Sequence, residues 1–132
     1  MKKILFFLFF VISFSAYSQN CNISERTDIS DARFEIIQSP VARKFTVKID
    51  KQTGETWQMV VDSNNKLCWE KLYKGAALEL DTKNEGKNNY IIFMGGFATK
   101  DMFLMNVNTG ACWQLVNDTS DNSNLWSPMK TF

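Results

Sequence analysis

Polar and apolar residues alternate along several short stretches of this chain. The clearest stretch is Lys44–Asp50, in which Phe45, Val47 and Ile49 are apolar and the other four residues are polar or charged. A period of two is typical of a β-strand with one buried and one solvated face. Weaker alternation or short apolar runs predict further strands over Arg33–Gln38, Glu55–Asp62, Leu67–Leu72, Tyr90–Met94, Asp101–Asn106, Ala111–Asp118 and Leu125–Pro128.

A turn pattern follows the strand at Lys44–Asp50. Lys51-Gln52-Thr53-Gly54 fits a type I turn that closes with glycine in the left-handed region, and Glu55–Asp62 returns as the partner strand. Asp50 can accept backbone N–H groups across this turn, because a short carboxylate bonds readily to the backbone just after it. The stretch therefore predicts a β-hairpin.

The chain repeats this hairpin 56 residues later. Ile49–Val60 and Met105–Val116 share the pattern Thr-Gly-x-x-Trp-Gln-x-Val at the same spacing. We interpret the pattern as a tandem duplication, with repeat 1 at 33–72, a linker at 73–89 and repeat 2 at 90–129. The positions that define the repeat are Asp50, Gly54 and Trp57 in the first copy and Asn106, Gly110 and Trp113 in the second.

The second copy is more apolar than the first. Met102 and Leu104 stand where the first copy has Thr46 and Lys48, so both faces of the second hairpin are apolar. We expect this copy to be the more buried one, or to present an exposed apolar face.

Strands with frequent turns and no convincing helix predict an all-β fold. Each copy leaves one apolar face uncovered, and two such faces can pack about 10 Å apart. We therefore expect one domain over 19–132, in which two tandem antiparallel hairpin repeats form a small pseudo-two-fold sandwich or flattened barrel. Outside the strands, we expect one helical turn near Ser24–Thr27 and a solvated loop over Asp81–Asn89.

The segment Asp50-x-x-Thr53-Gly54-x-x-Trp57 resembles the hairpin repeat of quinoprotein-type β-propeller blades. In that family three residues usually separate the glycine from the tryptophan, whereas two do so here, which puts Trp57 and Trp113 on the opposite face. Two copies are also too few for a propeller of four or more blades. The resemblance therefore implies the hairpin shape, without a cofactor or catalysis. The pattern is also similar to that of small exported bacterial proteins with this hairpin in tandem.

The first 18 residues are typical of a signal peptide. Lys2 and Lys3 precede the apolar run Ile4–Ile12, and small residues follow at Ala16 and Ser18. The run is shorter than the roughly 20 apolar residues that span a bilayer, so no membrane span is predicted. We expect an exported protein of a Gram-negative bacterium, periplasmic or extracellular. Export permits disulfides, and the three cysteines, Cys21, Cys68 and Cys112, predict one disulfide or none.

Charge and residue types exclude several classes of function. The formal charge is +1 and the charges are interspersed, which argues against a nucleic-acid partner. The chain has no histidine, so Ser-His-Asp and Cys-His catalytic arrangements are excluded and the common zinc sites lack a ligand. We expect no cofactor, no metal and no enzymatic activity.

Two tryptophans near strand ends are the candidate binding residues. Core packing is the interpretation for Trp57 and Trp113, whereas Trp69 and Trp126 lie beside polar turns and could form exposed stacking platforms. The candidate ligand- or partner-binding residues are Trp69, Trp126, Asn64 and Asn122.

Two oxygen-rich features have a structural alternative. Asp62 and Asp118 could act as a carboxylate pair on a glycosidic bond, but both precede turns in which aspartate caps the backbone. Asp118, Ser120, Asn122 and Asn124 alternate as in a calcium loop, yet the glycine and the final glutamate of such a loop are missing, so a polar surface loop is the preferred interpretation.

Three functions follow from these residues. The first is a non-catalytic exported domain that recognises a glycan or a protein at the cell envelope. The second is a structural module that assembles with other chains, including copies of itself, through its sheet edges. The third is a hydrolase that uses Asp62 and Asp118.

Overall fold

The computed structural model describes residues 25–26, 31–39, 45–76, 78–95, 101–120 and 122–130. These residues contain β-strands and no α-helix, which confirms the all-β prediction. No helix among them is long and apolar enough to cross a membrane. The strands are β1 (Glu25–Arg26), β2 (Phe34–Gln38), β3 (Thr46–Asp50), β4 (Thr56–Val61), β5 (Leu67–Lys74), β6 (Tyr90–Met94), β7 (Met102–Asn106), β8 (Cys112–Asn117) and β9 (Asn124–Pro128).

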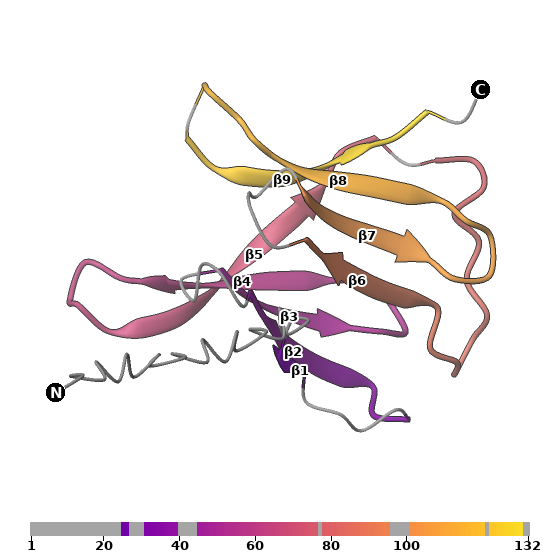
Figure 1. Cartoon of the computed structure of the whole chain (residues 1–132), viewed down its shortest axis with the longest axis horizontal. Helices are drawn as coiled ribbons and strands as arrows, with labels where there is room; N and C mark the ends of the chain where they lie inside the picture. The colour runs from indigo at the N-terminus through magenta and orange to yellow at the C-terminus, as the bar shows by residue number, and fades with distance from the viewer. Residues whose placement is uncertain are drawn as a thin grey trace, which may run out of the picture.

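All of these strands belong to one sheet that curls into a nearly closed barrel (Figure 1), which fits the expected flattened barrel. Its order is β1-β2-β3-β4-β5-β9-β8-β7-β6, so an antiparallel first meander, β2–β5, meets an antiparallel second meander, β6–β9. The two meanders join through the parallel pair of β5 and β9, at Tyr73↔Leu125 and Lys74↔Trp126. On the other side, the N–H groups of Asn89 and Tyr90 bond to the carbonyl of Lys51 and draw β6 towards the end of β3.

The two meanders use the same strand registers. Phe34↔Asp50 in β2 and β3 corresponds to Tyr90↔Asn106 in β6 and β7, with both partners 56 residues apart. In the last pair of each meander the register changes by one residue, because Trp69 lies opposite Met59 and Trp126 lies opposite Leu115. We call residues at equivalent places in these registers matched positions.

The parallel junction reverses the faces of the sheet at matched positions. Matched strands run in the same direction, but their neighbours follow in opposite order across the sheet. In L-peptides the strand direction and the direction of a residue's N–H group together fix the face that carries its side chain. Matched side chains must therefore lie on opposite faces. Ile37 is 0% exposed and its match Phe93 is 63% exposed.

For this reason, the core is formed by one face of the first meander and by the opposite face, in matched positions, of the second. Thr56 belongs to this interior although it is polar, because its hydroxyl accepts a 2.6 Å hydrogen bond from Nε1 of Trp126. This bond joins the two meanders inside the barrel. The buried apolar residues are Ile37, Val47, Ile49 and Leu72 from the first meander and Tyr90, Ile92, Met94, Met102, Leu104, Ala111, Trp113, Leu115 and Trp126 from the second.

The hairpin turns have the predicted geometry. Oδ1 of Asp50 accepts the N–H groups of Gln52 and Thr53, and Oδ1 of Asn106 accepts the N–H of Asn108. Gly54 and Gly110 have φ angles of 74° and 75°, in the left-handed region that favours glycine. The predicted hairpins and their glycine closures are confirmed.

The two glycines differ in what surrounds them, and this gives a test of the fold. A Cβ atom on Gly54 would lie 2.9 Å from the ring of Tyr90, whereas a Cβ on Gly110 would meet nothing within 4 Å. We expect Gly110→Ala to lower the free energy of unfolding by about 1 kcal/mol, from backbone strain alone. Gly54→Ala should lower it by about 2–3 kcal/mol, because the ring must also move. Urea unfolding of both variants measures the difference, and equal losses would contradict this contact.

Some expectations outside the hairpins were wrong. Glu25–Arg26 pairs with β2 as a strand, where a helical turn was expected. The linker is not simply a solvated loop, because Asn89 is buried and its side-chain amide bonds to the carbonyls of Gln52, Asn84 and Lys87. β5 also continues to Lys74, two residues past its expected end. The predicted signal peptide lies outside the described residues.

Candidate functional site

The outward side of the first meander carries an apolar face. By register, this side includes Phe34, Ile36, Lys48, Trp57, Met59, Val61, Leu67, Trp69, Lys71 and Tyr73, which together we call the outer face. Six of the ten exposed large hydrophobic residues of the described chain belong to it: Phe34, Ile36, Val61, Leu67, Trp69 and Tyr73. The matches of Phe34, Ile36 and Trp69 are Tyr90, Ile92 and Trp126, which lie in the core. The reversal of faces therefore leaves core-type side chains exposed here.

Lys48 lies at the centre of the outer face. Its Nζ is 4.4 Å from the ring centroid of Trp57 and 5.1 Å from that of Trp69, within the range of cation–π attraction. No carboxylate pairs with Lys48 within the described residues. Its match is the buried Leu104, so a cation on the outer face stands where the second meander has an apolar core residue. The two indoles thus hold an ammonium group that has no counter-ion among the residues that the structure describes.

Two ion pairs border the outer face. Nη2 of Arg33 lies 2.6 Å from Oδ2 of Asp50, and Nζ of Lys71 lies 2.6 Å from Oε1 of Glu55. Burial alone would raise the pKa of the Asp50 carboxyl, but the hydrogen bonds from Arg33 and the turn hold that pKa below its ordinary value. Arg33 and Lys71 are therefore already paired, and Lys48 is the charge of the outer face that has no ion-pair partner in the described part of the chain.

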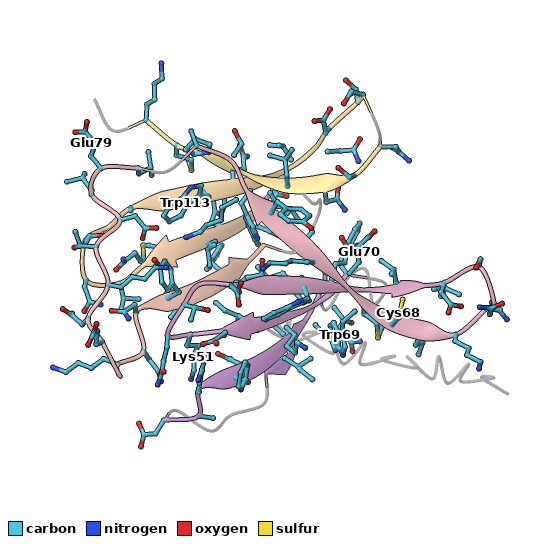
Figure 2. The ribbon with its side chains drawn as sticks, turned by 180° about the vertical axis from the view of Figure 1, so that it is seen from behind. Lys51, Cys68, Trp69, Glu70, Glu79 and Trp113 are labelled. Atoms are coloured by element: carbon cyan, nitrogen blue, oxygen red, sulfur yellow. The ribbon has the colours of Figure 1, made fainter. Side chains whose placement is uncertain are left out.

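The structure separates the two tryptophans that the sequence predicts as binding residues. Trp69 is 38% exposed on the outer face, whereas Trp126 is 0% exposed inside the barrel, so the expectation of an exposed Trp126 was wrong. The reversal of faces is the physical reason, since the two occupy matched positions. Trp113 is buried as expected, and Trp57 is half-buried beside Trp69 instead of in the core. Figure 2 shows Trp113 among the strands of the second meander, away from Trp69.

The other predicted polar residues lie in turns. Asn64 is exposed at the tip of the β4–β5 hairpin, and Asn122 is exposed in the β8–β9 turn with φ at 59°. Oδ1 of Asp62 accepts the N–H groups of Asn64 and Lys66, and Oδ1 of Asp118 accepts the N–H of Ser120. Both aspartates therefore make the predicted backbone caps.

The cysteines lie apart from each other. Cys68 is exposed on β5 and Cys112 is half-buried on β8, and they form no disulfide within the described residues. Burial raises the pKa of the Cys112 thiol, which lowers its nucleophilic thiolate fraction. Cys21 lies outside the described residues, so a pairing with it stays a prediction to be tested.

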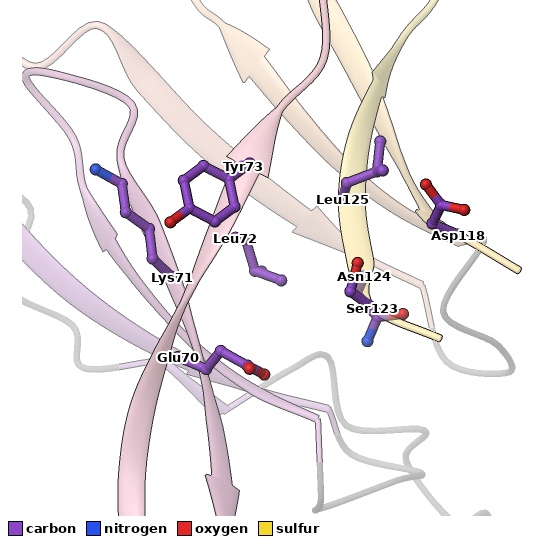
Figure 3. Close-up of a pocket in the computed structure, with 8 residues that line it drawn as sticks. All are labelled: Glu70, Lys71, Leu72, Tyr73, Asp118, Ser123, Asn124 and Leu125. Carbon is purple, nitrogen blue, oxygen red and sulfur yellow. The ribbon is translucent and has the colours of Figure 1, made fainter. Parts of the chain in front are cut away.

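A cavity of about 410 Å³ opens where β5 and β9 separate, and we call it the notch (Figure 3). Within the described residues, the two strands pair only at Tyr73 and Lys74, and the preceding part of β5, Leu67–Leu72, has no neighbouring strand on that side. Glu70 on β5 and Asp118 after β8 both line this space. The notch is bounded by Glu70, Lys71, Leu72, Tyr73, Asp118, Ser123, Asn124 and Leu125.

A polar cluster lies inside the barrel, where sequence reasoning placed a solvated loop. Oδ1 of Asp81 accepts a 2.6 Å hydrogen bond from the Tyr90 hydroxyl and a 3.1 Å bond from Asn106, and its Oδ2 lies 3.0 Å from Nζ of Lys74. Burial would raise the pKa of Asp81, but these three donors hold it below its ordinary value. Alternation patterns carry no sign of this cluster, because Asp81 comes from an irregular segment.

The cluster predicts a loss of stability in alkali. Burial first, and the Asp81 carboxylate second, raise the pKa of Tyr90 above its ordinary value of 10.0. A raised folded-state pKa stabilises the fold below the unfolded pKa, and this stabilisation is lost as pH rises through the folded value. From about pH 9 to about pH 11, Tyr90 should therefore lower the free energy of unfolding by about 1 kcal/mol. Tyr90→Phe should remove this component, and exposed Tyr73→Phe should retain it. Equal slopes in both variants would contradict the assignment.

Comparisons with known proteins leave the function to be inferred from these surfaces. No family model, no curated protein and no solved structure matches the chain.

Proposed function

We propose that this protein is a non-catalytic binding domain whose partner contacts the outer face. The observation that carries the proposal is the gathering of exposed apolar side chains around Trp69 and Lys48 on one side of the first meander. Scattered apolar residues are normal on a protein surface, but a contiguous patch is typical of an interaction site. Aromatic anchors such as tryptophan contribute most to binding at such sites.

A protein partner is favoured over a glycan by the composition of the face. Ile36, Val61 and Leu67 are exposed aliphatic side chains, which suit the apolar core of a protein interface. A sugar site needs hydrogen-bonding groups beside its aromatic platform. The two predicted amides, Asn64 and Asn122, lie in two separate turns and do not form such a set with Trp69. The predicted export would place the protein partner at the cell envelope.

The test compares partner capture by the full chain and two variants. Trp69→Ala removes the anchor of the outer face, and Phe93→Ala removes a more exposed aromatic residue of the second meander. Proteins cross-linked to the chain in an envelope preparation should be retained by Phe93→Ala and lost about tenfold or more by Trp69→Ala, since an anchor contributes about 2 kcal/mol or more. Partners that survive Trp69→Ala unchanged, or that are lost equally in both variants, would overturn the proposed face.

Assembly through a sheet edge is the second candidate function. It is favoured by β5, whose edge over Leu67–Leu72 has no strand beside it in the described part of the chain. Unpaired strand edges readily pair with other chains. The hydrolase candidate has less support, because Asp62 and Asp118 each bind the backbone of their own turn.

A further inference from the structure

The backbone groups on the free edge of β5 can be assigned from its neighbours. The N–H of Gly75 donates to the carbonyl of Trp126, so residues of the same parity in β5 direct their backbone groups towards the β9 side. On β5 these are Leu67, Trp69 and Lys71, whose side chains lie towards the outer face. Residues 68, 70 and 72 bond to β4 instead. The free edge therefore offers N–H and C=O groups over a length of about 20 Å.

This edge opens into the notch, and the notch is negatively charged. Within the described residues, Glu70 is exposed and has no cationic partner, and the Asp118 carboxylate accepts hydrogen bonds only from Ser120. Lys71 does not neutralise them, because it pairs with Glu55. Figure 3 shows Glu70 directed from β5 into the space towards β9. A peptide entering here would meet two carboxylates.

We propose that the partner adds an extended, basic segment to the free edge of β5, inside the notch. This inference rests on the proposed function and names the partner's chemistry. Side chains of an added strand alternate between faces. One set would lie beside Trp69 and Leu67 and should be apolar, and the other would lie beside Glu70 and should be lysine or arginine. Backbone pairing would supply affinity, and the alternation would supply specificity.

The experiment titrates the full chain with synthetic peptides, followed by calorimetry and by amide chemical shifts along β5. The probe alternates valine and lysine, and two controls alternate valine and glutamate, or carry N-methyl groups on the amides that would pair. We expect each control peptide to bind about tenfold or more weakly, and Glu70→Gln to weaken the lysine peptide severalfold.

Two variants of the chain isolate the backbone contribution. Lys71→Pro removes an N–H from the free edge while leaving the ladder to β4, because proline is tolerated where the N–H faces outward. It should abolish peptide binding, whereas Lys71→Ala should retain it. The N-methylated peptide gives the same information on the unaltered chain, so a misfolded proline variant does not end the test.

The outcomes are distinguishable from failure of the proposed function. Equal binding of the N-methylated peptide would overturn strand addition, and equal binding of the glutamate peptide would overturn the basic partner. A dimer that Lys71→Pro dissociates would instead assign the edge to a second copy. If no peptide binds while partner capture still depends on Trp69, this inference fails and the binding face stands. If peptides bind but partner capture does not depend on Trp69, the proposed binding face fails and strand addition to the edge of β5 stands.

Discussion

Trp126→Ala is expected to lower the free energy of unfolding by about 3–5 kcal/mol, the range for removing a fully buried tryptophan. The side chain is enclosed by the core of the second meander. It also donates the buried hydrogen bond to Thr56 that joins the two meanders. Its removal leaves both a cavity and a hydroxyl without its donor, and each adds to the loss.

Trp69 provides the matched control for this substitution. It lies opposite Met59 as Trp126 lies opposite Leu115, yet it is on the exposed side of the sheet. We expect Trp126→Phe to cost about 2–3 kcal/mol and Trp69→Phe less than about 0.5 kcal/mol. Denaturant unfolding of the two variants measures this difference. Similar losses would mean that the faces are not reversed between the two meanders.

Asp81→Ala should have the second large effect, a loss of about 3–5 kcal/mol. The carboxylate is largely buried and accepts from Tyr90, Asn106 and Lys74 together. Removing it takes the acceptor from the Lys74 ammonium group, from the Tyr90 hydroxyl and from one N–H of Asn106, whose amide keeps its bond to the Thr82 carbonyl. Breaking a largely buried pair on one side is strongly destabilising.

The control for Asp81 is the exposed pair of Glu55 and Lys71. Glu55→Ala breaks an ion pair of similar length but should cost less than about 1 kcal/mol, because solvent screens it. Acid adds a second measurement. The pKa of Asp81 is lowered from 3.8, so its stabilisation is present above that value and is lost as pH falls through the folded pKa. Asp81→Ala should therefore reduce the loss of unfolding free energy in acid. An unchanged dependence of that free energy on pH would contradict the role given to Asp81.

Patterns of neighbouring residues predicted most strands and hairpin turns correctly. The alternation at Lys44–Asp50 and the turn at Gly54 predict the hairpin closely, because both depend on side chains and φ angles of neighbouring residues. The strand predicted over Tyr90–Met94 has the observed bounds. The linker was harder to predict, since the burial of Asp81 and Asn89 depends on residues distant in sequence.

The candidate site depended on information that alternation does not contain. A period of two shows that a strand has two faces, but when both carry apolar residues it does not show which one is buried. Trp69 and Trp126 therefore look alike in sequence. Whether each is buried or exposed depends on the parallel pairing of β5 with β9, which in the described residues involves the two pairs at Tyr73 and Lys74. The notch arises from the same junction, so the sequence pattern did not predict it either.

The reversal of faces also means that the two hairpins are not interchangeable parts. Copying the first over the second would place a lysine at the buried position of Leu104, and the opposite copy would place leucine on the outer face in place of Lys48. Either replacement would therefore damage the core of one hairpin or the solubility of the other. The turns at Gly54 and Gly110 can be alike, because the left-handed φ that they require is the same whichever face of the hairpin is buried.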